Sequence, residues 1–472
     1  MHTIKEIYIN GAFVAPHGED IFPITDPATG VLIGHVTLAD RVDTRRAVAA
    51  AAAAFPAFAR SSKDERIAML TRLHARVLAC APALAEATIS EYGATAARAS
   101  WSAAYAAQAF LDAATTLAEF DFTPRMGNAT VRMEPLGVAA LLTPWNSNAG
   151  SICSKLAMAI AAGCTSVIKP SEMSALQTRV LSEALHAAAL PPGVVNIVTG
   201  RGDTVGAELS VHPDVARISF TGSTAVGKTI VCAAAETMKR VSLALGGKSP
   251  TLILADADVA HAVPQAIDIA FMNNGQACIA GTRLLVPAAR LDDVIALARH
   301  HVDAIVVGDP RDPATTLGPL ASAAQFARVQ QFIADGIASG ARLVAGGPGR
   351  PDGLAAGHFV RPTVFAQVDN SMRIAREEIF GPVLSIISYR DEDEAIALAN
   401  DSDFGLQAYV FTPDLARAQA LAARLHAGRV LINGMRNDPL APFGGVKQSG
   451  VGREFGAPGL ASYLEMKAVI VA

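Results

Sequence analysis

The sequence predicts an α/β protein whose parallel sheet is covered by helices on both faces. Between residues 137 and 245 short apolar runs alternate with helical stretches, and the alternation resumes between 251 and 432. The chain has 472 residues, of which 51% are hydrophobic and 17% are charged. Such a composition is typical of a globular protein with two or three domains.

The first 135 residues predict a hairpin and long helices. Asn10-Gly11 is a turn signal within residues 8–14. Pro56 is expected to end the first helix, and residues 121–134 are polar and β-like, as in an excursion from the core. The expected helices cover residues 42–55, 64–92 and 98–120.

The next residues predict two α/β sets. Strands of the first set are expected over 137–142, 165–168, 194–198, 218–220 and 241–245, with helices over 151–162, 175–188, from 204, and over 225–237. Strands of the second are expected over 251–254, 283–286, 341–345, 361–365, 383–389, 408–411 and 429–432, with helices over 259–272, 291–304, 322–339, 392–400 and 414–425. Residues 469–472 predict a last strand without a partner in the chain, which favours an oligomer because an exposed edge can pair with another chain.

Charge and composition exclude several classes. The net charge of −4 provides no basic surface for nucleic acid, and no apolar run reaches the roughly 18 residues of a membrane helix. The N-terminus has charges where a signal peptide would be apolar. The five cysteines lack metal-ligand spacing, so we expect no metal and a reducing, cytoplasmic location.

Residues 271–283, FMNNGQACIAGTR, surround Cys278 with small residues. A thiol at such a turn could be approached by a substrate, with backbone N–H groups free to bind what the sulfur attacks. A buried structural cysteine is the alternative. Asn146 follows an expected strand, and its neutral amide is a suitable donor to an oxyanion, although an Asx turn is the more common role.

Two strand ends suggest a dinucleotide. Gly222 and Ser223 begin a G-x-x-x-x-G turn that leads into a helix, whose free N–H groups suit a phosphate. Lys169 and Glu172 could bind ribose hydroxyls, and a carboxylate there favours NAD over NADP. The alternatives are an ordinary turn for the first pair and a helix cap for the second.

Seven segments in order resemble the aldehyde dehydrogenase superfamily over essentially the whole chain. They are PWN at 144–146, KPSE at 169–172, FTGST at 220–224, LGGK at 245–248, GQAC at 275–278, EEIFGP at 377–382 and PFGG at 442–445. The resemblance implies an NAD(P)-dependent oxidation of an aldehyde to a carboxylic acid through a thioester on Cys278, with Asn146 as the oxyanion donor.

The resemblance also implies the remaining site. Cofactor contacts are expected from Trp145, Lys169, Ser171, Glu172, Gly202, Gly222, Ser223, Leu245, Gly246, Glu378 and Phe380. Substrate contacts are expected from Ser147, Ser151, Met272, Ile279, Arg436 and Phe443. Arg436 could meet the acidic group of a semialdehyde, or it could be a solvated loop arginine.

Three parts are implied: a Rossmann-like cofactor domain (1–116 and 136–246), an α/β catalytic domain (247–446) and a small β arm (117–135 and 447–472). The arm residues 117–135 are expected to pair with the C-terminal residues and to build a homodimer or homotetramer.

The chain departs from the superfamily at Ala244, where a glutamate usually precedes Leu-Gly-Gly-Lys and acts as the general base. Loss of a positioned base typically costs about 10²–10⁴-fold in rate. Three explanations are open: an engineered Glu→Ala variant, another base such as Glu454, or coenzyme A in place of water. A homologue that binds dinucleotide without catalysis is a further alternative.

Overall fold

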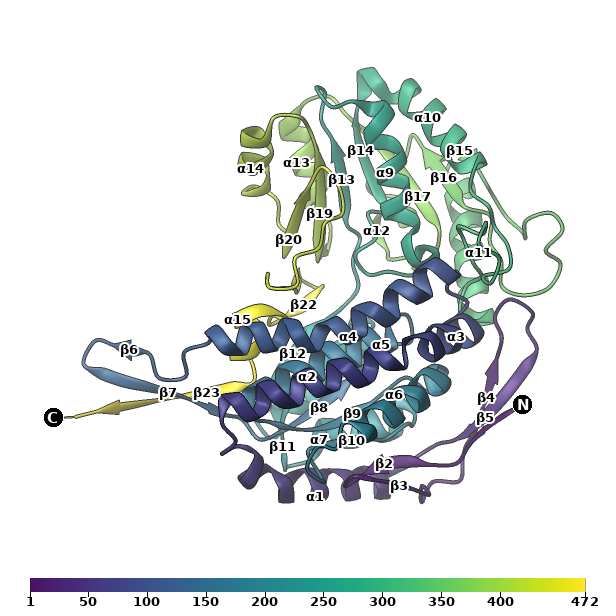
Figure 1. Cartoon of the computed structure of the whole chain (residues 1–472). Coiled ribbons are helices and arrows are strands. Elements are labelled where there is room, and N and C mark those ends of the chain that lie inside the picture. Colours follow the sequence, from purple (N-terminus) through teal and green to yellow (C-terminus); the bar gives the residue numbers. More distant parts are fainter. Residues whose placement is uncertain (472) are drawn as a thin grey trace.

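The computed structural model describes residues 1–471 and contains two large sheets (Figure 1). The first has eight strands in the order β22-β12-β11-β8-β9-β10-β2-β3. Its central strands β8 to β12 run parallel, whereas β22, β2 and β3 are antiparallel to their neighbours. The bounds are β22 Gly450–Val451, β12 Arg240–Ala244, β11 Val215–Thr221, β8 Val138–Leu142, β9 Thr165–Lys169, β10 Val195–Ile197, β2 Ile7–Ile9 and β3 Ala12–Val14.

Helices cover both faces of this sheet, as the sequence predicted. Ala139 and Leu141 of β8 pack into one apolar core with the helices α2, α4 and α5, whereas Val138, Ala140 and Leu142 pack into a second core with α1 and α7. Successive side chains of a strand point to opposite faces, so an all-apolar strand is buried on both. The helices are α1 Arg41–Phe58, α2 Lys63–Ala79, α3 Ala81–Tyr92, α4 Ala96–Glu119, α5 Asn148–Ala162, α6 Ala175–Ala187, α7 Ala207–Val211 and α8 Thr224–Ala235.

Two helix boundaries near the N-terminus were predicted wrongly. Pro56 lies inside α1 rather than ending it, because the N–H of Ala59 still reaches the Phe55 carbonyl at 2.8 Å and completes one more turn. The predicted helix 64–92 is two helices that meet at Cys80 with a bend of 61°. Pro82 in the first turn of α3 explains the break, because a proline has no N–H to continue the helix from α2 and is favoured in the first turn of a new helix.

The second sheet has seven strands in the order β15-β16-β17-β14-β13-β19-β20, and only β15 is antiparallel. Its strands are β13 Pro250–Ile253, β14 Arg283–Pro287, β15 Arg342–Ala345, β16 Thr363–Ala366, β17 Val383–Tyr389, β19 Gln407–Phe411 and β20 Arg429–Ile432. The helices are α9 Val259–Phe271, α10 Leu291–Asp303, α11 Ala323–Ala338, α12 Arg373–Arg376, α13 Glu392–Asn400 and α14 Leu415–Ala422. Figure 1 shows this unit above the first one.

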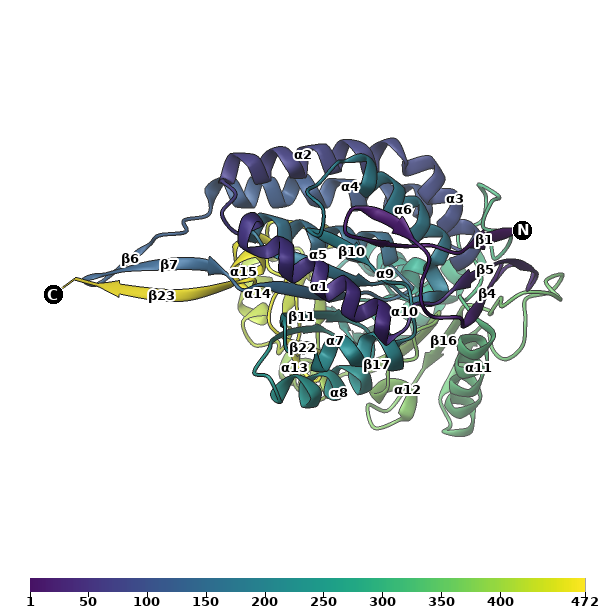
Figure 2. The same ribbon diagram turned by 90° about the horizontal axis from the view of Figure 1, so that it is seen from below.

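A β ribbon projects from the body of the molecule (Figure 2). Strand β23, Leu464–Ile470, pairs antiparallel with all seven residues of β7, Ala129–Pro135, and β6, Arg125–Met126, joins β7. The expected pairing of 117–135 with the C-terminal arm is confirmed. The expectation that the last strand lacks a partner in its own chain is wrong, and its last predicted residue, Ala472, lies outside the described residues.

Smaller elements complete the fold. β1 His2–Ile4, β5 Leu32–Thr37 and β4 Ile21–Thr25 form a three-stranded sheet, and β18 Phe404–Gly405 pairs with β21 Val446–Lys447. Helix α15 covers Gly456–Ala461. Over residues 1–471 no single helix is long and apolar enough to cross a membrane, although the bent α2–α3 pair meets the length and composition criteria when taken together.

We expect Phe110→Ala to lower the free energy of unfolding by about 3–5 kcal/mol, because the ring is fully buried on α4 and its removal leaves a cavity. Urea denaturation followed by circular dichroism measures the change. The exposed Gln108 on the same helix is the control, and Gln108→Ala should shift stability by no more than about 0.5 kcal/mol. Equal effects of the two substitutions would contradict the packing described here.

Candidate active site

Cys278 follows a tight turn between α9 and β14. Asn273, Asn274 and Gly275 all have left-handed backbone conformations, with φ of 54°, 58° and 73°. Asparagine and glycine tolerate this region better than other residues. A side chain at Gly275 would in addition lie 2.2 Å from the Gly381 carbonyl carbon. The turn therefore needs these residue types, and it rests against the loop that carries Glu378 and Phe380.

Two buried amide side chains hold this turn in place. Asn274 donates to the carbonyls of Gly93 and Pro319, both at 3.0 Å, and accepts from the Gly318 N–H at 2.8 Å. Gln276 accepts from the Ala321 N–H at 3.0 Å and donates to the Tyr92 hydroxyl at 3.3 Å. The sequence reasoning missed both residues. The consecutive Asn-Asn-Gly was the available signal, because it predicts a left-handed turn that needs support.

The Asn146 amide is bonded to the same turn. It follows β8, and its Nδ2 donates to the Gln276 carbonyl at 2.8 Å, while Asn273 donates to the Asn146 carbonyl at 3.0 Å. One N–H of Asn146 is used in this bond, and the second is available to a ligand. The predicted oxyanion donor and the predicted nucleophile thus belong to one bonded unit.

A cavity of about 310 Å³ opens beside Cys278. This volume is within the range of small-molecule sites. Ten predicted site residues line it: Trp145, Asn146, Gly222, Ser223, Ala244, Leu245, Gly246, Cys278, Glu378 and Phe380. Pro144, Thr221, Gln325 and Arg328 also line it and were not predicted.

Gln325 and Arg328 shape the wall of the cavity from α11. Gln325 donates to the Phe380 carbonyl at 2.6 Å, and Arg328 donates to the Glu378 carbonyl at 2.7 Å. Phe380 has a left-handed φ of 61°, which is unusual for an aromatic residue. Its ring meets that of Trp145 edge-on, with 5.4 Å between centroids. Nothing local in the sequence links α11 to this loop, which explains why both residues were missed.

The Glu378 carboxylate is the main acceptor of the cavity. Its Oε1 accepts from the Gly247 N–H at 3.1 Å, and its other oxygen has no hydrogen-bond partner within residues 1–471. Burial raises the pKa of Glu378 to about 7. A Cβ at Gly246 would lie 2.4 Å from Oε2, so the approach of carboxylate and backbone requires glycine there. Such an acceptor suits the hydroxyl groups of a sugar.

The N-terminus of α8 faces the same cavity. Ser223 caps this helix by accepting from the Val226 N–H at 3.4 Å, and the Gly222 N–H bonds to the Ala244 carbonyl at 3.2 Å. A Cβ at Gly227 would lie 2.7 Å from the Leu245 side chain, so the close packing of this helix requires glycine there. Free N–H groups at the first turn of α8 suit an anionic ligand.

Four predicted cofactor residues lie outside this cavity lining. Lys169 is buried at the end of β9 and donates to Glu172 at 3.3 Å, and Ser171 caps the 3₁₀ turn that begins at Glu172. Burial lowers the pKa of Lys169. Gly202 is exposed with open space around it, so its local geometry does not explain a glycine.

The thiol of Cys278 is poorly ionised in this environment. Burial, and next the Glu378 carboxylate, raise its pKa to about 12. Ala244 ends β12 with 2% of its surface exposed, and it supplies no proton acceptor. The thiolate is the nucleophilic form, so activation of Cys278 needs a base or an electrostatic change that a ligand brings.

Glu454 is the predicted alternative base. It accepts from the buried Lys155 in a short ion pair and from the Ser219 hydroxyl at 3.2 Å. Its backbone pairs with that of Phe443 through hydrogen bonds of 2.8 and 2.7 Å. Lys155 was not predicted from the sequence, because a lysine within an apolar helix carries no local signal of its partner.

The predicted substrate residues are divided between half-buried and exposed positions. All but Arg436 are half-buried: Ser147 and Ser151 at the start of α5, Met272 and Ile279 on either side of the Cys278 turn, and Phe443 beside the backbone of Glu454. Arg436 is exposed and makes no side-chain hydrogen bond or ion pair within the described residues, as a solvated loop arginine would.

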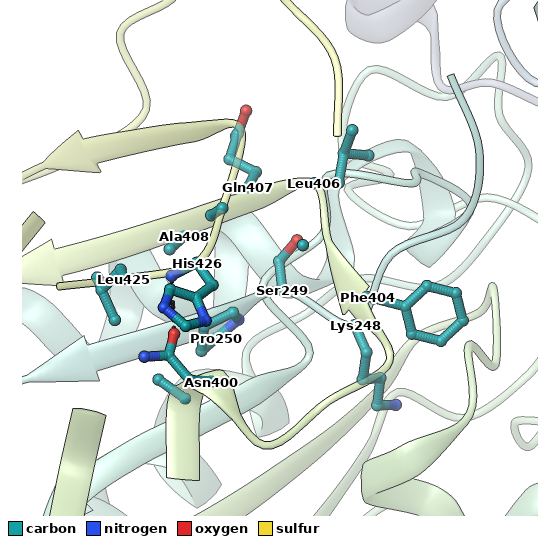
Figure 3. Close-up of a pocket in the computed structure, with 13 residues that line it drawn as sticks. Lys248, Ser249, Pro250, Asn400, Phe404, Leu406, Gln407, Ala408, Leu425 and His426 are labelled. Atoms are coloured by element: carbon teal, nitrogen blue, oxygen red, sulfur yellow. Dashed lines mark hydrogen bonds between the residues drawn. The ribbon is translucent and has the colours of Figure 1, made fainter. Parts of the chain in front are cut away.

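A second hollow lies on the other side of the Gly247–Lys248 segment (Figure 3). Lys248 is only 1% exposed, and burial together with the Arg283 charge lowers its pKa to about 7. Its amine points away from Asn400 and His426 in Figure 3. The hollow has a volume of about 10 Å³, which leaves room for about one water molecule and for no substrate.

Comparison with known proteins gives one family. The model of the aldehyde dehydrogenase family matches residues 13–469. A 3-succinoylsemialdehyde-pyridine dehydrogenase from Pseudomonas sp is 45% identical over 476 residues, which cover 100% of this chain and 99% of the relative.

Solved structures agree with this match. A cysteine-to-alanine mutant of aldehyde dehydrogenase C from Pseudomonas syringae, in complex with NAD+ and octanal, is 46% identical with a TM-score of 0.98, covering 99% of this chain and 97% of that one. A Mycobacterium tuberculosis aldehyde dehydrogenase in complex with NAD+ is 38% identical with a TM-score of 0.97. The match covers 100% of this chain and 98% of that one.

The raised pKa of Cys278 predicts a steep pH dependence of its alkylation in the ligand-free protein. Because the thiolate fraction grows tenfold per pH unit below the pKa, the rate with iodoacetamide should rise about tenfold per unit from pH 7 to pH 9. Peptide mass spectrometry measures it, with the peptide of the exposed Cys232 as a reference for the reagent. A plateau below pH 9 would show that the thiol is already activated.

Proposed function

Since this chain belongs to the aldehyde dehydrogenase family, we propose that it oxidises an aldehyde with NAD+ through a thioester on Cys278. The observation that carries the proposal is one cavity in which Cys278, the Asn146 turn and an acceptor carboxylate meet. In the first step the Cys278 sulfur bonds to the aldehyde carbon, and the carbonyl oxygen gains negative charge. The Asn146 amide and the Cys278 N–H stabilise that oxyanion.

The residues around the cavity fit a dinucleotide. The start of α8 at Gly222 and Ser223 would bind the phosphates. Glu378 would accept hydrogen bonds from the ribose hydroxyls, and Phe380 and Trp145 would contact the nicotinamide. Lys169, Ser171, Glu172, Gly202, Leu245 and Gly246 complete the proposed set. When bound, NAD+ accepts the hydride that the substrate carbon loses. The carboxylate of Glu172 favours NAD over NADP, because it would repel an additional phosphate.

Release of the product is the step that Ala244 impairs. Hydrolysis of a thioester needs a base to activate water, and residue 244 supplies none. We propose that Glu454 with Lys155 is the alternative base, supported by their ion pair and by the effect of the Glu454 charge on Cys278. Coenzyme A as the acyl acceptor is the second candidate, and Ala244 is the observation that favours it.

We further propose the three-part division given by the sequence, with residues 1–116 and 136–246 for the cofactor, 247–446 for catalysis, and 117–135 with 447–472 as the arm. The cavity supports it, since Ser223 comes from the first part and Cys278 from the second. The five free cysteines support a cytoplasmic location.

Mixing the enzyme with NAD+ and an aldehyde should give one burst of NADH per Cys278, followed by slow turnover, with the acyl adduct visible in the intact mass.

Ala244→Glu should raise steady-state oxidation about 10²–10⁴-fold, because it restores a base. Ala244→Gln, of similar size but without a base, is the matched control. Absence of any burst points to a protein that binds dinucleotide without catalysis, and turnover restored by coenzyme A identifies the second candidate.

We propose that the ribbon of β7 and β23 joins copies of this chain into a dimer or tetramer. Met466 and Ile470 on β23 are 63% and 72% exposed, and apolar residues on an exposed edge favour pairing. Light scattering should therefore give a mass that is a multiple of 48.8 kDa. Ile470→Asp should lower that mass, whereas a monomeric unchanged protein would refute the assembly.

A further inference from the structure

We propose that Tyr409 of β19 is a positioning residue, which holds the backbone of Cys278 and Ile279 in the form needed for attack on the aldehyde. Its buried hydroxyl binds the Ile279 carbonyl, and the Gln407 amide orients that hydroxyl. The inference rests on the proposed oxidation and adds two residues that act on its nucleophile without touching substrate or cofactor.

A second tight turn contains Cys278 itself. The Ala280 N–H donates to the Ala277 carbonyl at 3.1 Å and closes this turn. Cys278 and Ile279 are its two central residues. The carbonyls of central residues have no partner inside such a turn, so they need contacts elsewhere when they are shielded from water. The form of the turn therefore depends on what these two carbonyls meet.

Both carbonyls are held from outside the turn. A Cβ at Gly247 would lie 2.4 Å from the Cys278 carbonyl oxygen, so this oxygen rests directly on the Gly247 backbone. The Ile279 carbonyl accepts from the Tyr409 hydroxyl at 2.9 Å. The Tyr409 ring also supports the end of the turn, because a Cβ at Gly281 would lie 3.3 Å from its Cδ2.

Tyr409 occupies a place where an apolar side chain would otherwise be expected. Strand β19 is buried throughout, and Tyr409 shares an apolar core with Phe411 on the same face of the strand. A hydroxyl in such a place is unfavourable unless it is bonded. It accepts from Nε2 of the buried Gln407, which can only donate, so the hydroxyl proton is left for the Ile279 carbonyl.

The turn determines which N–H groups face the sulfur. Burial and next the Glu378 charge raise the pKa of the Cys278 thiol, whereas the N–H groups of Cys278 and Ile279 act against this rise. Donors to the sulfur favour its thiolate form. The Cys278 N–H is also the proposed donor to the oxyanion. Loss of the bond at the Ile279 carbonyl would therefore weaken both the nucleophile and the oxyanion donor.

Tyr409→Phe removes the hydroxyl and keeps the ring. We expect it to slow the NADH burst at saturating NAD+ and butanal about 10- to 100-fold, because a small displacement of a reacting group has an effect of this order. The dissociation constant for NAD+ should not change, since Tyr409 does not line the cavity.

Gln407→Leu tests the orienting amide and serves if Tyr409→Phe does not fold. It should slow the burst by a smaller factor of about 3- to 10-fold, because the hydroxyl remains but is free to rotate. The double variant should be no slower than Tyr409→Phe alone, as expected for two members of one relay. A burst that Gln407→Leu leaves unchanged would contradict the orienting role.

Tyr389→Phe is the matched control. Tyr389 is buried in the same sheet, and its hydroxyl donates to the Ile253 carbonyl at 2.8 Å. Tyr389 and Ile253 end their parallel strands, whereas the Cys278 turn precedes the start of β14. Both substitutions remove one buried hydroxyl-to-carbonyl bond and should lower stability by similar amounts, but only Tyr409→Phe should slow the burst. Equal burst rates in the two variants would overturn the proposal.

Alkylation separates this inference from the oxidation itself. In the ligand-free protein at pH 8, Tyr409→Phe should lower the reaction rate of Cys278 with iodoacetamide at least about threefold relative to Tyr389→Phe, because the thiolate loses a donor. The peptide of the exposed Cys232 is the reference. If no aldehyde gives a burst in the unchanged protein, the proposed oxidation fails, and the alkylation rate still decides whether Tyr409 acts on Cys278. Equal alkylation rates would refute the positioning role whatever the burst shows.

Discussion

The site depends on the support of three consecutive left-handed residues by two buried amides. Asn273 and Asn274 are held in a conformation that an unsupported chain would populate weakly. Asn274 and Gln276 stabilise the turn through hydrogen bonds to chain segments near residues 93 and 318–321. Because these partners come from both α/β units, the position of Cys278 is a property of the whole fold rather than of its own loop.

Burial has opposite effects on the two halves of the site. It raises the pKa of Glu378 to about 7 and makes its carboxylate a stronger acceptor, which favours binding of hydroxyl groups. The same burial raises the pKa of Cys278, so that the protonated thiol predominates at neutral pH. A site of this kind reacts slowly by itself and depends on its ligands or on a nearby base for activation. Residue 244 is an alanine and supplies no carboxylate for that activation.

The sequence predicted most elements because local patterns specify them. The all-apolar strand β8 and the Asn10-Gly11 hairpin follow from periodicity and turn chemistry. Local patterns were insufficient at Pro56, through which α1 continues, and at Cys80, after which Pro82 lies in the first turn of a new helix. The cavity residues carried by family motifs were found together, whereas Gln325 and Lys155 were missed. Their contacts are with partners 54 and 299 positions away in the chain, and such contacts leave no trace in a local pattern.

The contact between Gly275 and the Gly381–Pro382 backbone has a mechanical consequence. No atom separates the two loops, so the segment that carries the sulfur and the segment that carries Glu378 and Phe380 cannot slide past each other. A displacement of either loop is transmitted to the other without a hinge between them. The position of the Cys278 turn is therefore coupled to that of the loop with Glu378 and Phe380 by direct contact of their backbones.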